Sequence, residues 1–316
     1  MIINTGARTD TVQYYTEWLL GRFREGYVCT RNPVAPLKVT RYELTPDKVD
    51  CVVFCSKNYR PILKDLHEIT DRFNTYFQYT ITAYGKDMEP GVPSIDESIA
   101  TLYELEKQVG KRRICWRYDP IFLLGEYTVE KHLETFRYMT EKLAGHVDRC
   151  VFSFVELYRY LNHFMPELFP VSESDKNKIA EGLGSIAREF GMKICTCGTN
   201  GNYSKYGIGA SGCITSEILG RANGVEFRKV RQNGQREGCH CIENHDIGDY
   251  NSCPNGCRYC YANIDRKHVM DNYRKRHDPK SPILLGNITD ADTVIQGSQE
   301  SYLVRPKDPR QMTLDH

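Results

Sequence analysis

Strand-like and helix-like segments alternate over residues 1–197, and this alternation restricts the possible folds more than any other feature of the chain. The expected strands are short, β-branched or aromatic, and apolar on both faces, as buried parallel strands tend to be: Ile2–Asn4, Val39–Leu44, Cys51–Cys55, Tyr76–Thr82, Arg113–Arg117, Cys150–Val155 and Met192–Cys197. The expected helices between them are Thr11–Arg24, Pro61–Arg72, Ile95–Val109, Val129–Leu143 and Asp175–Phe190. Such alternation produces right-handed βαβ units and a parallel sheet. About six units favour a (β/α) barrel, complete or partial, although periodicity alone leaves an open sheet as the alternative.

The pattern changes after Gly198. Residues 198–213 are rich in Gly, Asn, Ser and Tyr, and residues 224–262 combine many Cys, Gly and Arg with little regular pattern. Three regions are therefore expected: a (β/α) barrel over 1–197, a cysteine-rich iron–sulfur region over 198–263 that closes the barrel mouth, and a C-terminal helix (266–276) with a polar tail over 264–316. The stretch 207–212 matches G-x-G-x-x-G, but no βαβ unit follows it, so we interpret it as a flexible loop that delivers Cys213.

Composition excludes several classes of protein. The formal net charge is +1, which excludes a histone-like polycation and an acidic tail protein. No signal peptide is visible, and the longest apolar runs are far shorter than the roughly 20 residues of a membrane span, so no membrane partner is expected. We expect a cytoplasmic protein with reduced thiols. Its 13 cysteines then indicate metal binding or catalysis more than disulfides.

Three cysteines near the end of the chain have the spacing of an iron–sulfur site. Cys253, Cys257 and Cys260 form C-x3-C-x2-C, with Tyr259 before the last cysteine. Three thiolates can bind a 4Fe-4S cluster and leave one iron open. In radical S-adenosylmethionine (SAM) enzymes that iron chelates SAM, and an electron from the cluster cleaves SAM to a 5′-deoxyadenosyl radical. The alternative is a structural zinc site with a fourth ligand from Cys239-His240-Cys241.

Four further cysteines are candidates for a second metal centre. Cys197 lies at the carboxyl end of an expected strand, and Cys213, Cys239 and Cys241 follow in the irregular region. These four residues could hold a second, fully ligated iron–sulfur cluster, and we expect at least three of them to meet. The alternative is that they are scattered structural thiols. Cysteines within the apolar runs are most simply small core residues: Cys29, Cys51, Cys55, Cys115 and Cys150.

Polar residues follow several of the expected strands. The candidates for cofactor binding are Arg8, Asp10, Lys57, Asn58, Arg117 and Asp119. Because the carboxyl ends of parallel strands lie on one side of a barrel, these residues are expected to face one cavity together with the cysteine triplet. The guanidinium of Arg117 could clamp a carboxylate or phosphate through two parallel hydrogen bonds. The alternative is an internal Arg117–Asp119 ion pair that only supports a loop.

Several motifs together resemble a prokaryotic family catalogued only as domain of unknown function 1848. They are Ala7-Arg8-Thr9-Asp10, Tyr14-Tyr15, Glu17-Trp18, Arg31-Asn32-Pro33, Ser56-Lys57-Asn58, Trp116-Arg117-Tyr118-Asp119-Pro120-Ile121 and the terminal cysteine block. The resemblance covers nearly the whole chain, and it implies C-terminal cysteines similar to the radical SAM motif. One feature departs from radical SAM enzymes, which carry this motif after the first barrel strand. Here it comes last, so none of their usual SAM-binding motifs is transferred.

Three functions follow from these features. The first is a radical SAM-type enzyme with a 4Fe-4S cluster, SAM and an electron donor such as ferredoxin or flavodoxin. The second is an iron–sulfur or zinc module for redox sensing or electron transfer, without SAM chemistry. The third is modification or repair of nucleic acid, suggested by a locally basic stretch with aromatics over 221–280. The segment 311–315 also faintly resembles sliding-clamp-binding peptides.

Overall fold

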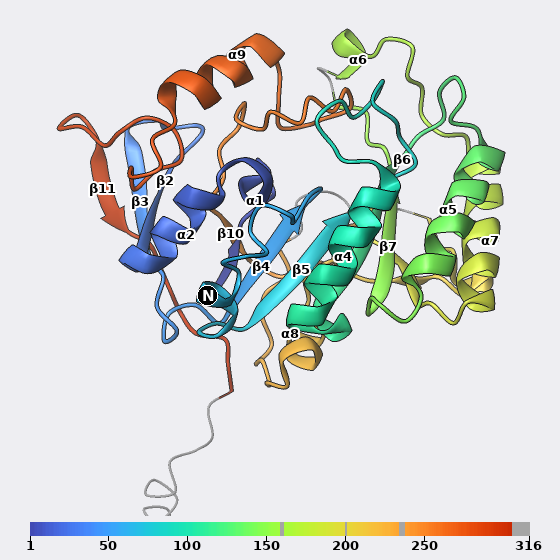
Figure 1. The fold of residues 1–316 in the computed structure, drawn as a ribbon, viewed down its shortest axis with the longest axis horizontal. Coiled ribbons are helices and arrows are strands. Elements are labelled where there is room, and N and C mark those ends of the chain that lie inside the picture. Colours follow the sequence, from blue (N-terminus) through green and yellow to red (C-terminus); the bar gives the residue numbers. More distant parts are fainter. Residues whose placement is uncertain (159–160, 200, 234–237, 305–316) are drawn as a thin grey trace, which may run out of the picture.

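The computed structural model describes residues 1–158, 161–199, 201–233 and 238–304. Within these ranges one eight-stranded sheet has the order β10-β1-β4-β5-β6-β7-β8-β9, and all neighbouring strands are parallel (Figure 1). The strands are β1 (Ile2–Asn4), β4 (Cys51–Ser56), β5 (Thr75–Thr80), β6 (Ile114–Ile121), β7 (Arg149–Phe154), β8 (Ile194–Thr196), β9 (Gly209–Ala210) and β10 (His245–Asp246). The α/β class and the parallel sheet are thus confirmed. In the described residues β9 and β10 are the edges of an open sheet, which is consistent with a partial (β/α) barrel.

The strand expected at 39–44 forms, but its assignment to the barrel is wrong. β3 (Lys38–Glu43) pairs antiparallel with β2 (Tyr27–Arg31) and parallel with β11 (Thr293–Gln296) in a separate three-stranded sheet. Only Val39 of β3 is buried, as in a strand with one solvated face rather than a buried parallel strand. Neither β2 nor β11 is among the strands expected from the sequence.

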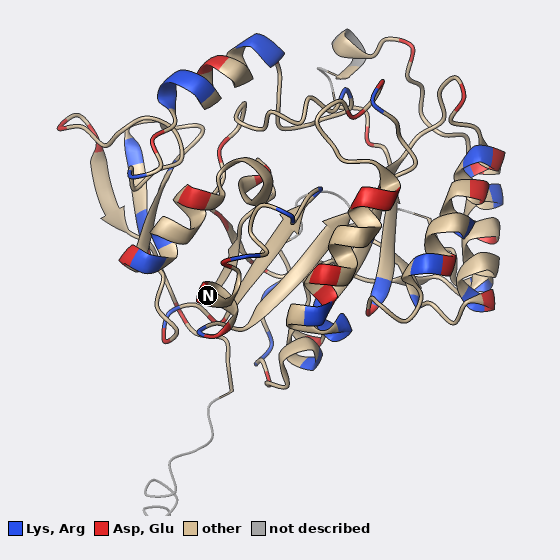
Figure 2. Ribbon diagram, viewed as in Figure 1, with Lys and Arg blue, Asp and Glu red and all other residues tan. Residues whose placement is uncertain are grey.

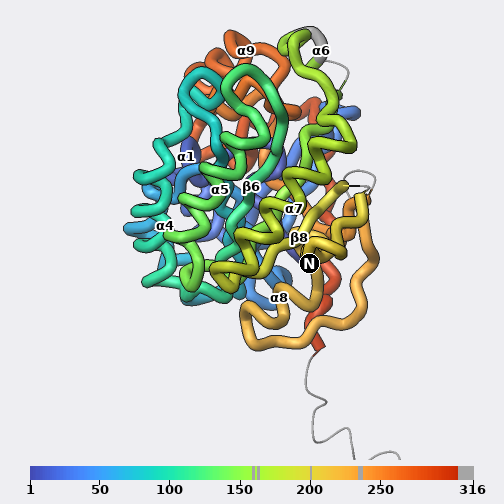
Figure 3. The backbone as a smooth tube through the Cα atoms, turned by 90° about the vertical axis from the view of Figure 1, so that its right-hand side faces the viewer, coloured from blue at the N-terminus to red at the C-terminus, as the bar shows by residue number. Residues whose placement is uncertain are grey.

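Three expected helices cover one face of the sheet. α4 (Ile95–Val109) and α5 (Val129–Leu143) have the expected bounds, and α7 spans Glu173–Glu189. The three helices lie side by side (Figure 3). α4 begins with a capping box, in which Ser94 Oγ accepts the N–H of Glu97 and the Glu97 carboxylate accepts the N–H of Ser94.

The other helices are shorter than expected. The segment 11–24 divides into α1 (Thr11–Tyr14) and α2 (Thr16–Glu25). The segment 61–72 contains only α3 (His67–Thr70), because backbone bonds of the i→i+3 type, such as Asp65 N–H to the Ile62 carbonyl at 3.0 Å, replace α-helical bonds. The remaining helices are α6 (Leu161–Phe164), α8 (Ser216–Asn223) and the basic α9 (Arg266–Asp271), which continues as a π-helical turn, Asn272–Arg276 (Figure 2). No helix in the described residues is long and apolar enough to cross a membrane.

Both faces of the parallel sheet are buried. One set of alternating residues, including Ile3, Phe77 and Trp116, belongs to the same hydrophobic cluster as the buried residues of α2, α4, α5 and α7. The other set, including Val53 and Cys115, packs against the chain that follows β9, including α8. Because the strands are parallel, the loops after β1, β4, β5 and β6 all emerge on one side of the sheet.

Candidate metal and ligand site

The C-x3-C-x2-C segment forms a closed loop on the side of the sheet where the strands end. The N–H of Asn251 donates to the carbonyl of Ala262 at 2.9 Å and closes the loop around the three cysteines. The N–H of Gly91, beyond β5, donates to the carbonyl of Asn255 at 2.8 Å. This triplet loop, residues 251–262, is therefore fixed beside the segment that follows β5.

Asp10 joins the triplet loop to the ends of β1 and β4. Its buried carboxylate accepts hydrogen bonds from Ser56 Oγ at 2.7 Å and from the N–H of Lys57 at 2.9 Å. It also accepts the N–H of Gln13 at 3.0 Å, which starts α1, and Nδ2 of Asn255 at 3.4 Å. Burial raises the pKa of Asp10 although these donors oppose the shift. The carboxylate is thus satisfied within the protein and fixes three segments in place.

The three thiols of the triplet differ in exposure. Cys253 is buried, Cys257 and Cys260 are half-buried, and all three are free. Burial raises the pKa of Cys253 to about 12, and burial with the nearby Glu89 carboxylate raises that of Cys257. The N–H of Ala262 donates to Sγ of Cys260 at 3.4 Å, as backbone amides do around cluster sulfurs. The triplet therefore offers three thiols as candidate metal ligands in a loop that is fixed by hydrogen bonds.

A buried carboxylate beside the triplet is absent from the sequence-based site. Oε1 of Glu89 accepts Lys57 Nζ at 2.9 Å and Thr82 Oγ1 at 2.8 Å, and it also accepts the hydroxyl of Tyr259. Lys57 Nζ lies 5.8 Å from the ring centroid of Tyr259. Glu89 lies in the loop after β5, and no local pattern indicates that it would meet a residue of the cysteine motif. Only the fold brings the two together.

Arg117 and Asp119 form the ion pair that the sequence left open as an alternative. Nη2 of Arg117 binds Oδ2 of Asp119, and the Ser153 hydroxyl donates to the other carboxylate oxygen. Nη1 of Arg117 lies 3.3 Å from both Cys55 Sγ and Gln78 Oε1. These residues come from β4, β5, β6 and β7, so the group lies across the middle of the sheet.

Arg8 and Asn58 lie at the margin of this group. Nε of Arg8 is 3.5 Å from Oδ2 of Asp246, and its guanidinium lies 5.3 Å from the ring centroid of Tyr250. Burial raises the pKa of Asp246 to about 6. The Asn58 side-chain oxygen accepts the N–H of Arg60 at 3.0 Å and so stabilises the turn after β4. This bond gives the Asn58 side chain a role in the turn.

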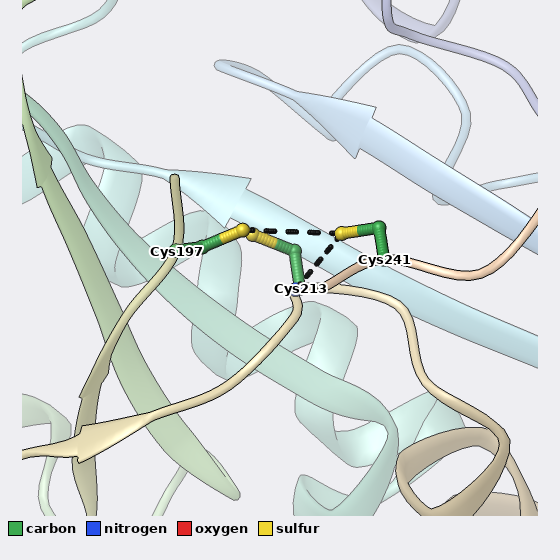
Figure 4. A group of neighbouring side chains, drawn as sticks. All are labelled: Cys197, Cys213 and Cys241. Carbon is green, nitrogen blue, oxygen red and sulfur yellow. Dashed lines mark hydrogen bonds between the residues drawn. The ribbon is translucent and has the colours of Figure 1, made fainter. Parts of the chain in front are cut away.

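Three cysteines from separate segments, Cys197, Cys213 and Cys241, come together (Figure 4). Cys239 contacts Cys197, and the four residues are called the cysteine quartet. The Sγ atoms of Cys197, Cys213 and Cys241 lie within 4.8 Å of one another, and all three residues are buried. Sγ of Cys197 is 3.9 Å from both Cys239 Sγ and Cys241 Sγ. Thiol hydrogen bonds from Cys197 and Cys241 lower the pKa of Cys213, and nearby Arg117 acts in the same direction. The three buried cysteines of the quartet, Cys197, Cys213 and Cys241, could hold a metal.

The Arg117–Asp119 pair is electrostatically connected with both cysteine groups. Cys197 and Cys213 are among the charged neighbours of Arg117, and Asp119 is among those of Lys57. Lys57 in turn faces Cys257. Among the described residues, the triplet has no set of three metal-ligating atoms within 4.8 Å of one another. The sulfur atoms of the three buried quartet cysteines are thus closer together than those of the triplet.

Two other features lie away from these groups. The segment 311–315, which resembles sliding-clamp-binding peptides, is outside the described residues. Surface hollows of about 360 Å³ and 280 Å³ are both lined partly by α7, and neither lining includes a cysteine. The two cysteine groups and the charged residues near them lie away from these hollows, and the triplet loop lies at the carboxyl ends of the parallel strands.

The fold and these side chains define an α/β protein with a parallel sheet and a buried cysteine group that could bind a metal. The chain belongs to the family described as Domain of unknown function (DUF1848), whose model matches residues 2–262. The expected family is confirmed, and the match ends just after the triplet. No curated protein and no solved structure matches the chain.

Proposed function

We propose that the chain is an iron–sulfur enzyme of the radical SAM type, with Cys253, Cys257 and Cys260 as the ligands of one 4Fe-4S cluster. The observation that carries the proposal is the position of the triplet loop. Three free thiols lie where parallel strands end, next to Lys57 and Glu89. In parallel α/β folds this is the side on which ligands bind.

The donor set fits such a cluster. Ligands of a cubane bind different irons, so their sulfurs stand further apart than the ligands of a single ion. Among the described residues, the three triplet sulfurs do not all lie within 4.8 Å of one another, so they are not spaced as the ligands of a single ion. With three thiolates the cluster keeps one iron open for SAM, and reductive cleavage of SAM supplies the 5′-deoxyadenosyl radical. An electron donor such as ferredoxin or flavodoxin would be its partner, in the cytoplasm.

Among the residues expected at the cofactor, the structure supports two different roles. Lys57, Arg117 and Asp119 keep 14%, 22% and 14% of their side-chain surface exposed, and we assign them to ligand contact. Arg8 at the margin could contact the outer part of a ligand. Asp10 is a positioning residue, because its carboxylate is already bound by protein donors.

The proposal is tested with the full chain purified without oxygen. We compare the wild type with Cys257→Ser and with Cys29→Ser, a buried cysteine of β2 that matches the change in thiol number. Iron and sulfide are counted, and paramagnetic resonance of the reduced protein is recorded with and without SAM. The wild type and Cys29→Ser should show a signal that changes with SAM, and Cys257→Ser should lose it. A cluster whose signal ignores SAM would instead support an electron-transfer or sensing module.

A nucleic-acid substrate is the second candidate, favoured by exposed aromatic side chains near the triplet. Tyr250 and Tyr261 are 41% and 49% exposed, and Arg8 lies over Tyr250. Bases stack on such rings beside a cation. Fluorescence anisotropy with a labelled single-stranded oligonucleotide tests this idea, because Tyr250→Ala should weaken binding at least severalfold. Equal affinity in the wild type and the variant would remove it.

A further inference from the structure

We propose that the cysteine quartet binds a single tetrahedral zinc ion rather than a second iron–sulfur cluster. The Sγ atoms of Cys239 and Cys241 each lie 3.9 Å from that of Cys197. A tetrahedral zinc with Zn–S bonds of about 2.3 Å places its sulfurs about 3.8 Å apart. Cubane ligands stand further apart because they bind different irons. The spacing therefore matches one ion and is too small for a cluster.

Backbone contacts hold the four ligands in this arrangement. Cys197 directly follows β8, Cys213 follows β9, and Cys239 and Cys241 come from the segment that leads to β10. The N–H of Cys213 donates to Sγ of Cys241 at 3.1 Å, a contact that also stabilises a metal-bound thiolate. A Cβ on Gly212 would lie 2.7 Å from the carbonyl of His240, so glycine permits the close approach of the two segments. The site is thus formed by the fold.

A buried arginine provides independent support for a negative centre. Arg149 is 7% exposed, and Nη2 lies 3.2 Å from the Gly212 carbonyl and 3.4 Å from that of Cys213. Its Nε has no hydrogen-bond partner, and no ion pair within 4.0 Å is found for it in the described part of the chain. A buried cation needs a counter-charge. A zinc ion bound by four thiolates carries two net negative charges and supplies it.

Arg117 is a second cation near the same centre. Its guanidinium has Cys197 and Cys213 among its charged neighbours in addition to Asp119. Both arginines therefore have Cys213 of the quartet among their electrostatic neighbours. This charge arrangement suits a dianionic site.

The centre has four protein ligands and no open position, which is typical of structural zinc. The ion would hold together the end of β8, the loop after β9 and the segment that leads to β10. Zinc and iron then divide between the two cysteine groups. This assignment does not depend on the proposed SAM chemistry, because it concerns a different set of ligands.

The test measures zinc, iron and acid-labile sulfide in the full chain purified without oxygen. The wild type should contain one zinc, bound to four sulfurs at about 2.3 Å by X-ray absorption. Cys213→Ser should lose the zinc, whereas Cys195→Ser, a buried cysteine two residues before Cys197, should keep it. Cys257→Ser should lose iron and sulfide but keep the zinc, which separates this inference from the proposed function.

The wild-type absorption spectrum keeps the inference testable where Cys213→Ser fails to fold. Replacing the zinc by Co²⁺ in the wild type should also give the intense thiolate–cobalt bands of a tetrahedral site. The inference would be overturned if the quartet held iron and sulfide, so that both decreased in Cys213→Ser relative to the wild type. A single iron without sulfide, or zinc that survives the loss of Cys213, would overturn it as well.

Discussion

Lys57 Nζ lies 2.9 Å from Oε1 of Glu89, and this ion pair connects the end of β4 with the loop after β5. The triplet loop is joined to this ion pair by Tyr259, which lies inside the cysteine motif and donates its hydroxyl to the same carboxylate. Glu89 is 2% exposed, so these partners compensate the burial of its carboxylate.

Replacing Lys57 by Met should therefore destabilise the protein by about 3 kcal/mol, because an uncompensated buried carboxylate remains. The double variant Lys57→Met/Glu89→Gln should recover at least half of that loss. Denaturant unfolding of the wild type, both single variants and the double variant measures the coupling. Strictly additive losses would show that the two residues do not stabilise each other.

The contact between Gly91 and the triplet loop gives a steric prediction. A Cβ at Gly91 would lie 2.8 Å from Cα of Asn255, so Gly91→Ala should destabilise the protein by about 2 kcal/mol and loosen residues 251–262. Hydrogen exchange of that segment provides the measurement. Gly21→Ala is the matched control, because its nearest atom would be 3.8 Å away and its exchange pattern should stay unchanged. Unaltered exchange in Gly91→Ala would contradict the docking of the loop.

Arg117 distinguishes a ligand clamp from a loop support. Arg117→Lys keeps the charge but loses the planar fork, so SAM affinity should fall about tenfold if the guanidinium binds a carboxylate of the ligand. Calorimetric titration of SAM into the iron-loaded protein measures this. Arg24→Lys, at an exposed ion pair with Glu68, should leave the affinity unchanged. If Arg117→Lys binds SAM as the wild type does, the residue has a structural role and the ligand lies elsewhere.

His132 predicts a loss of stability in acid. Its ring nitrogens lie 2.8 Å from the Tyr118 hydroxyl and 2.9 Å from the Phe122 carbonyl, and burial lowers its pKa from 6.5 to about 4. A histidine with a lowered folded pKa stabilises the fold above pH 6.5 and loses this contribution as the pH falls towards 4. The loss amounts to about 3 kcal/mol. The free energy of unfolding, measured between pH 7 and 4, should show this loss in the wild type but not in His132→Asn. The same pH dependence in both proteins would contradict the role given to His132.

The sequence predicted the elements whose bounds depend on neighbouring residues alone. The bounds of α4 and α5 followed from apolar periodicity and from N-caps such as Ser94. β3 formed where expected, but its partners could not be predicted, because β11 pairs Thr293 with Lys38 across most of the chain. A short strand with one buried residue contains no signal for the sheet to which it belongs.

The candidate site divides in the same way. Cysteine spacing selected the residues of the triplet, and position in the irregular region selected the quartet. Whether thiols meet depends on long-range backbone contacts, such as the one between Cys213 and Cys241. Glu89 and Arg149 have no sequence motif, and their importance follows only from the groups that the fold places around them. Burial and charge compensation are properties of the folded chain.

The position of the triplet loop also orders the assembly of the molecule. Asp10 and Gly91, which contact Asn255, leave the ribosome long before the loop does, and so do β1 to β8. The surface that receives the triplet can therefore form while its thiols are still being synthesised. The three thiols are then added to a surface that has already folded, so any metal that they bind would be loaded late in maturation.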